Sequence, residues 1–96
     1  MDLIERISDK NISVGIVGLG YVGIPLSLGF ANQEIKVIGF DVDQNKIELV
    51  SKGESYIKHI PSRSVSKTVS DGYFFATSNF GKISEVDCII LCVPTP

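Results

Sequence analysis

The sequence predicts an α/β fold built on a parallel β-sheet, and three features of its 96 residues predict it. Short apolar segments without a polar face alternate with segments of helical periodicity, as in parallel sheets that are covered by helices. A glycine-rich turn follows the first apolar segment and precedes the first helical one. The composition, with 44% apolar and 21% charged residues, excludes a disordered chain.

The first half of the chain predicts two strands with a helix between them. Residues 12–17 and 35–41 are almost entirely apolar and β-branched, which favours strands that are buried on both faces. Residues 21–32 predict a helix with one apolar face, and Pro25 lies near its start, where a missing N–H group costs least. Residues 2–10 predict a short amphipathic helix ahead of the first strand.

The second half predicts the rest of a doubly wound sheet. Asp43 can cap a helix that ends near Gly53. A helix, a strand, a helical turn and a fourth strand are then predicted at residues 62–70, 73–77, 79–84 and 87–93. Right-handed crossovers would place the strands in the order 3-2-1-4. Because the fourth strand has no polar face, we expect it to be central in a larger sheet. Residues 1–96 would then be the amino-terminal part of a dinucleotide-binding domain in a longer protein.

Charge and hydropathy argue against two classes of partner. The net charge of −2 and the isoelectric point near 5.2 argue against nucleic-acid binding, which needs a cationic surface. Residues 11–33 carry no charge and are long enough to cross a bilayer. They include five glycines and a proline, however, which is a poor composition for one uninterrupted helix. We therefore expect no membrane segment.

The cysteines and the single histidine predict no metal site and no catalytic residue. Cys88 and Cys92 lie in an apolar run without a histidine or a second cysteine pair, so buried, reduced thiols of a cytoplasmic protein are expected. His59 has no neighbouring carboxylate and nucleophile, which favours a surface or loop position.

The glycine-rich turn is the most informative motif. Gly18, Gly20 and Gly23 have the spacing G-x-G-x-x-G between a strand and a helix, and Asp41 ends the second strand. We expect Gly18 to permit the tight turn, Gly20 to let a pyrophosphate approach the backbone, and Gly23 to let the helix pack closely. N–H groups at the helix start would bind the phosphates. This pattern is typical of a Rossmann-type dinucleotide-binding fold.

Asp41 also predicts which cofactor is used. A carboxylate there would accept hydrogen bonds from the adenosine ribose and repel a 2′-phosphate, so NAD is favoured over NADP. Lys46 could reach the adenosine side, although a solvated helix lysine explains it equally well. Thr95 follows the fourth strand at the sheet edge where ligands bind, or is an ordinary loop residue. A ligand-free bend and an S-adenosylmethionine methyltransferase are the alternatives for the glycine motif itself.

Three motifs resemble the amino-terminal domain of UDP-sugar 6-dehydrogenases. They are G-L-G-Y-V-G-I-P-L at residues 18–26, G-F-D-V-D-x-x-K at residues 39–46 and C-V-P-T-P at residues 92–96. The segment G-E-S-Y-I-K-H-I-P at residues 53–61 is similar to the branch that acts on UDP-N-acetylglucosamine. The resemblance implies NAD contacts at Gly18, Gly20, Tyr21, Val22, Gly23, Asp41, Lys46 and Thr95.

The resemblance also implies an activity. The family oxidises the sugar C6 alcohol to a carboxylate with two NAD, through a covalent cysteine intermediate. The family's cysteine motif is absent from these 96 residues, so we expect no catalytic residue and no turnover from them alone. The UDP-sugar would bind other parts of the protein, which we expect to be a homo-oligomer at full length. UDP-glucose and UDP-N-acetylmannosamine are alternative substrates, and a non-catalytic NAD-sensing module is an alternative function.

Overall fold

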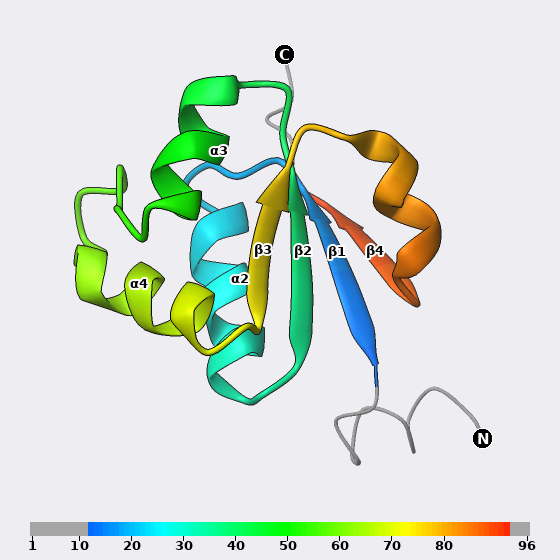
Figure 1. Ribbon diagram of the computed structural model, residues 1–96, viewed down its shortest axis with the longest axis horizontal. Helices are drawn as coiled ribbons and strands as arrows, with labels where there is room; N and C mark the ends of the chain where they lie inside the picture. The colour runs from blue at the N-terminus through cyan, green and yellow to red at the C-terminus, as the bar shows by residue number, and fades with distance from the viewer. Residues whose placement is uncertain (1–11, 93–96) are drawn as a thin grey trace.

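The computed structural model describes residues 12–92, which form one four-stranded parallel sheet with flanking helices (Figure 1). The elements are, in chain order, β1 (Ser13–Val17), α2 (Gly23–Asn32), β2 (Lys36–Phe40), α3 (Gln44–Ser51), α4 (Ser62–Ser70), β3 (Phe74–Thr77), the 3₁₀ helix η1 (Phe80–Glu85) and β4 (Cys88–Leu91). The helix expected at residues 2–10 and the site residue Thr95 lie outside the described residues.

The strand order β3-β2-β1-β4 confirms the predicted order, and all three strand pairs are parallel. In register, Val14 of β1 lies beside Val37 of β2, which lies beside Phe74 of β3. These three side chains point to the same face of the sheet and are buried. The carboxyl ends of β1 and β2 therefore meet at one edge, and the loops that follow them lie next to each other.

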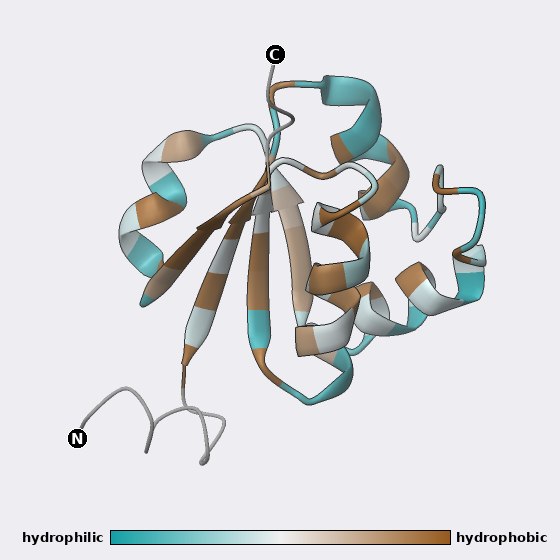
Figure 2. Cartoon of the chain, turned by 180° about the vertical axis from the view of Figure 1, so that it is seen from behind, coloured by the Kyte–Doolittle hydropathy of each residue, from teal (hydrophilic) through white to brown (hydrophobic). Residues whose placement is uncertain are grey.

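Helices α2, α3 and α4 cover one face of the sheet, where the main hydrophobic core lies (Figures 1 and 2). This placement follows from the crossovers, because β1, β2 and β3 are added in one direction across the sheet. The buried hydrophobic residues of the three helices are Ile24, Leu28 and Ala31 in α2, Ile47 and Val50 in α3, and Val65 in α4. This packing fixes the start of α2 against the edge of the sheet.

The opposite face of the sheet is covered less, and among the described residues η1 lies on that side. The rings of Phe40 in β2 and Phe80 in η1 are 5.6 Å apart between centroids. Ile89 and Leu91 of β4 are 47% and 71% exposed, and Phe75 of β3 is also exposed. Figure 2 shows β4 as a strongly hydrophobic strand at the end of the sheet. An apolar face of this kind is normally covered in a folded protein.

Two details differ from the sequence expectations. Helix α2 begins at Gly23 rather than at residue 21, because Pro25 has no N–H group to continue the hydrogen-bond pattern back to Tyr21. Cys88 and Cys92 are free thiols, but they are half-buried rather than buried, because β4 has a neighbouring strand on one side only. Within residues 12–92, no helix combines the length and the hydropathy needed to cross a membrane.

Candidate cofactor-binding site

The loop between β1 and α2 has the geometry of a tight strand-to-helix turn. Gly18 adopts φ 101°, a left-handed conformation that favours glycine, and its N–H donates to the Phe40 carbonyl at 2.8 Å. A Cβ atom at Gly23 would lie 1.7 Å from the Gly18 carbonyl oxygen. Gly18 and Gly23 are therefore required by the fold itself, the first by its conformation and the second by the close packing of helix on loop.

Gly20 is required neither by its backbone conformation nor by close packing. Its φ is not in the left-handed region, and a Cβ atom added there would meet no other atom within 4 Å. The missing side chain leaves open space in front of the loop. Among the residues that the structure describes, no acceptor takes a hydrogen bond from the N–H groups of Gly20, Tyr21 and Val22. Unpaired N–H groups around an open space at a helix start fit a bound phosphate group.

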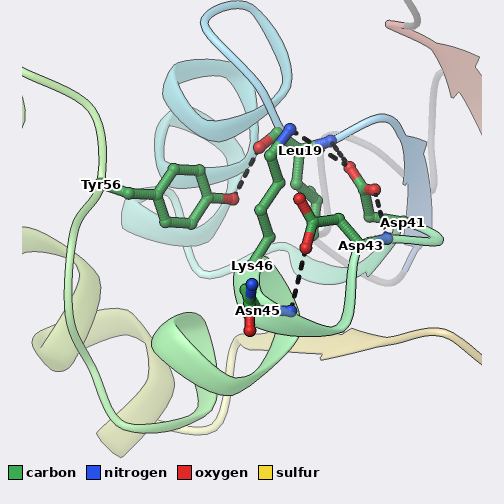
Figure 3. Close-up of polar contacts among 6 residues, drawn as sticks. All are labelled: Leu19, Asp41, Asp43, Asn45, Lys46 and Tyr56. Carbon is green, nitrogen blue, oxygen red and sulfur yellow. Dashed lines mark hydrogen bonds and ion pairs between the residues drawn. The ribbon is translucent and has the colours of Figure 1, made fainter.

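Asp41 lies directly after β2 and faces the same loop (Figure 3). Its Oδ2 atom accepts the Leu19 N–H at 2.9 Å, and its Oδ1 atom accepts the Asp43 N–H at 2.9 Å. The side chain is only 12% exposed, which is low for a carboxylate. Each oxygen keeps a further lone pair, so the carboxylate can also accept hydroxyl groups of a ribose.

Lys46 and Tyr56 surround this carboxylate. The Lys46 Nζ atom lies 3.9 Å from Asp41 Oδ2 and 6.0 Å from the centre of the Tyr56 ring. The Tyr56 hydroxyl donates to the Leu19 carbonyl at 2.6 Å. Burial, followed by the charges of Asp41 and Asp43, raises the pKa of Tyr56 above its ordinary value of 10.0. Tyr56 is therefore a neutral hydrogen-bond donor at physiological pH.

A pocket of about 240 Å³ opens beside Asp41. It is lined by Val17, Gly18, Phe40, Asp41, Val42, Lys46 and Phe80. Val42 is 84% exposed and adds apolar surface beside the carboxylate. A pocket with apolar and aromatic walls beside one carboxylate is suited to a flat aromatic group that carries a hydroxylated sugar.

The structure brings together most of the residues that the sequence singled out. Gly18, Gly20 and Gly23 form the loop, with Asp41 and Lys46 beside it, and Tyr21 and Val22 are exposed at the start of α2. Thr95 lies outside the described residues. Sequence reasoning missed Tyr56 and Phe80. Tyr56 lies in the segment that resembles one branch of a known family, but no local pattern points to its contact with Leu19, 37 residues away.

The comparison with protein families assigns this chain to a known one. Residues 12–96 match the UDP-glucose/GDP-mannose dehydrogenase family, NAD binding domain. A UDP-N-acetyl-D-mannosamine dehydrogenase of Campylobacter jejuni is 41% identical over 85 residues, covering 86% of this chain and 20% of that protein.

Two solved structures share the fold. The NDP-N-acetyl-D-galactosaminuronic acid dehydrogenase from Methanosarcina mazei Go1 has a TM-score of 0.80 and 34% identity, over 100% of this chain and 23% of that one. A ternary complex of GDP-mannose dehydrogenase from Pseudomonas aeruginosa has a TM-score of 0.82 and 32% identity, over 86% of this chain and 20% of that one. The chain thus spans about a fifth of the length of these relatives. The motifs, the strand order and these matches agree: the chain belongs to the UDP-glucose/GDP-mannose dehydrogenase family and matches its NAD binding domain.

Proposed function

We propose that this chain is the NAD-binding part of a nucleotide-sugar 6-dehydrogenase. The open space at Gly20 carries the proposal, because no protein atom and no backbone conformation explains a glycine there. The pyrophosphate would lie in that space, against the N–H groups of Gly20, Tyr21 and Val22. Bound NAD would supply the hydride acceptor for oxidation of the C6 alcohol of the sugar.

Asp41 holds the adenosine ribose in this proposal. Its carboxylate is already oriented by two backbone N–H groups, so little ordering is needed when the ribose hydroxyls bind. The same charge, together with that of Asp43, repels a 2′-phosphate and favours NAD over NADP. Lys46 lies 3.9 Å from Asp41 and would contact the adenosine side of the cofactor.

The adenine ring would lie in the pocket beside Asp41. Val42 and Phe80 supply apolar and aromatic surface there, and Phe80 is itself supported by Phe40. Covering Val42 with a ring would remove its exposed apolar area from water, which favours binding.

We further infer that these 96 residues are the first part of a longer dinucleotide-binding domain. The relatives are about five times longer, and the exposed apolar face made by Phe75, Ile89 and Leu91 is suited to packing by further helices of the same protein. The remaining strands, the sugar-binding domain and the catalytic groups would then lie elsewhere in the polypeptide. Cys88 and Cys92, as free thiols, support a cytoplasmic location.

The substrate that we propose is a UDP-N-acetylhexosamine. The segment at residues 53–61 supports UDP-N-acetylglucosamine, whereas the name of the Campylobacter jejuni relative supports the mannosamine epimer. The names of two of the relatives include an N-acetylated hexose or its acid, which favours this class over UDP-glucose.

The stoichiometry of the reaction tests the proposed activity. Oxidation of an alcohol to a carboxylate removes four electrons and consumes one water, so about two NADH should form per sugar. The complete protein that contains this chain should be incubated with NAD and each UDP-sugar in turn: the gluco and manno N-acetyl epimers and UDP-glucose. Two NADH from one N-acetyl epimer support the proposal. One NADH per sugar, or none from any UDP-sugar, contradicts it, and NAD binding without turnover would favour a sensing module.

A further inference from the structure

Leu19, in the glycine loop, is held by its side chain and by both of its backbone polar groups. Its side chain is completely buried and packs on β2, where a Cβ atom added to Gly39 would lie 2.7 Å from Leu19 Cδ2. Its N–H donates to Asp41 Oδ2, and its carbonyl accepts from the Tyr56 hydroxyl (Figure 3). The two peptide groups that flank Leu19 are therefore each fixed by one side chain.

Tyr56 is well placed to hold this carbonyl. Its bond to Leu19 is short, at 2.6 Å between oxygen atoms. The turn that presents it is itself ordered, because the Ser55 N–H donates to Ser62 Oγ and the neighbouring Ile57 is buried. The raised pKa keeps the hydroxyl protonated, so it stays a donor.

The planar peptide bond links the Tyr56 contact to the side of the loop where the cofactor would bind. The Leu19 carbonyl and the Gly20 N–H belong to one planar unit, and this bond is trans because the described residues contain no cis peptide bond. In a trans unit the N–H points away from the carbonyl. When Tyr56 fixes the carbonyl, it therefore fixes the direction of the Gly20 N–H, which has no other partner among residues 12–92.

We propose that Tyr56 is a positioning residue for the pyrophosphate: its hydroxyl holds the Leu19 carbonyl and so directs the Gly20 N–H toward the phosphate oxygens. This inference rests on the proposed function, in which the glycine loop binds NAD. Without the hydroxyl, the loop samples further orientations of this peptide, and binding must order it again. A lost neutral hydrogen bond of this kind weakens binding by about 3- to 10-fold.

The test is the variant Tyr56→Phe in the complete protein, because phenylalanine keeps the ring and removes only the donor. Tyr73→Phe is the matched control, because Tyr73 is also half-buried and its hydroxyl makes no hydrogen bond within residues 12–92. Calorimetry measures the binding of NAD, of ADP-ribose and of adenosine, and thermal unfolding checks the fold. ADP-ribose contains the pyrophosphate and adenosine does not.

In Tyr56→Phe, NAD and ADP-ribose should bind about 3- to 10-fold more weakly, with adenosine within about 2-fold of the unmodified protein. Tyr73→Phe should change none of the three. Unchanged NAD binding in Tyr56→Phe, or equal weakening of all three ligands, would overturn the inference, since a purely structural role affects every ligand alike. If the unmodified protein does not bind NAD, the proposed function fails, and this inference fails with it.

Discussion

Replacing Asp41 by alanine should weaken NAD binding strongly while the protein still folds. The change removes the acceptor of the Leu19 N–H and of the Asp43 N–H, each at 2.9 Å, and the partner of Lys46 at 3.9 Å. In the proposed complex it also removes the acceptor of the ribose hydroxyls. The loss of stability and the loss of NAD affinity can therefore be estimated separately.

The loss of stability should be about 1 to 5 kcal/mol. The Leu19 N–H is partly buried, and leaving it without an acceptor costs about 1 to 3 kcal/mol. The Asp43 N–H is exposed, so water replaces its acceptor at a cost below about 1 kcal/mol. The ion pair with Lys46 is partly exposed and contributes at most about 1 kcal/mol. Because domains are usually stable by about 5 to 15 kcal/mol, Asp41→Ala should still fold.

The loss of binding free energy for NAD should be about 3 to 6 kcal/mol. Hydrogen bonds to a charged acceptor contribute about 1.5 to 3 kcal/mol each, and two ribose hydroxyls can reach this carboxylate. We therefore expect NAD to bind at least about 100-fold more weakly to Asp41→Ala. Isothermal titration calorimetry measures the affinity, and urea unfolding measures the stability.

Asp43→Ala is the matched control for this experiment. Asp43 caps α3 by accepting the Asn45 N–H at 3.0 Å, and its loss should cost about 1 kcal/mol of stability without weakening NAD binding. If Asp41→Ala binds NAD within about threefold of the unmodified protein, the ribose role of Asp41 is refuted. Equal losses of affinity in the two variants would attribute the effect to α3 instead.

Three further predictions follow from the packing, the titration and the charges of the site. Gly23→Ala should lower the free energy of unfolding in urea by about 3 kcal/mol or more, because the new Cβ would lie 1.7 Å from the Gly18 oxygen. Gly29→Ala, on the same helix with no atom within 4 Å, should raise it by about 0.5 to 1 kcal/mol. Equal effects would refute this account of α2. The raised pKa of Tyr56 means that, above about pH 10, the unfolded chain loses a proton that the folded chain retains, so stability should fall with rising pH there. The free energy of unfolding, measured in urea at about pH 8 and pH 11, should fall less in Tyr56→Phe than in the unmodified protein. Equal falls in the two proteins would contradict the role of Tyr56 in this pH dependence. In a competition assay with labelled NAD, NADP should displace the label at least about 10-fold less well than unlabelled NAD does, because Asp41 repels the 2′-phosphate of NADP. Equal displacement by the two cofactors would contradict the proposed preference for NAD.

Much of the fold was predictable because its signals are local. Apolar runs marked all four strands, and the helix at Ser62–Ser70 has the predicted bounds. The strand order followed from the handedness of the crossovers, which depends on backbone twist rather than on particular side chains. The start of α2 was misplaced because the effect of Pro25 depends on which residue opens the helix.

The site was predictable only in part, because several of its contacts join distant residues. The glycine spacing and the acid after β2 identified the loop and Asp41. The two hydrogen bonds by which Asp41 orders the backbone were not foreseen, since the bond to Leu19 spans 22 residues. The Tyr56 contact spans 37 residues, and the half-burial of the thiols depends on which strand lies beside β4. These features depend on tertiary packing, which local sequence patterns do not encode.

NAD binding by Gly20→Ala tests the central claim most directly. A Cβ atom at this position meets no protein atom within 4 Å, and the backbone conformation there is open to alanine, so the fold should be unaffected. The methyl group would instead occupy the space assigned to the pyrophosphate. We predict an unchanged or slightly higher melting temperature together with NAD affinity lowered by at least about 10-fold. A variant that keeps both its melting temperature and its full affinity for NAD would contradict the account.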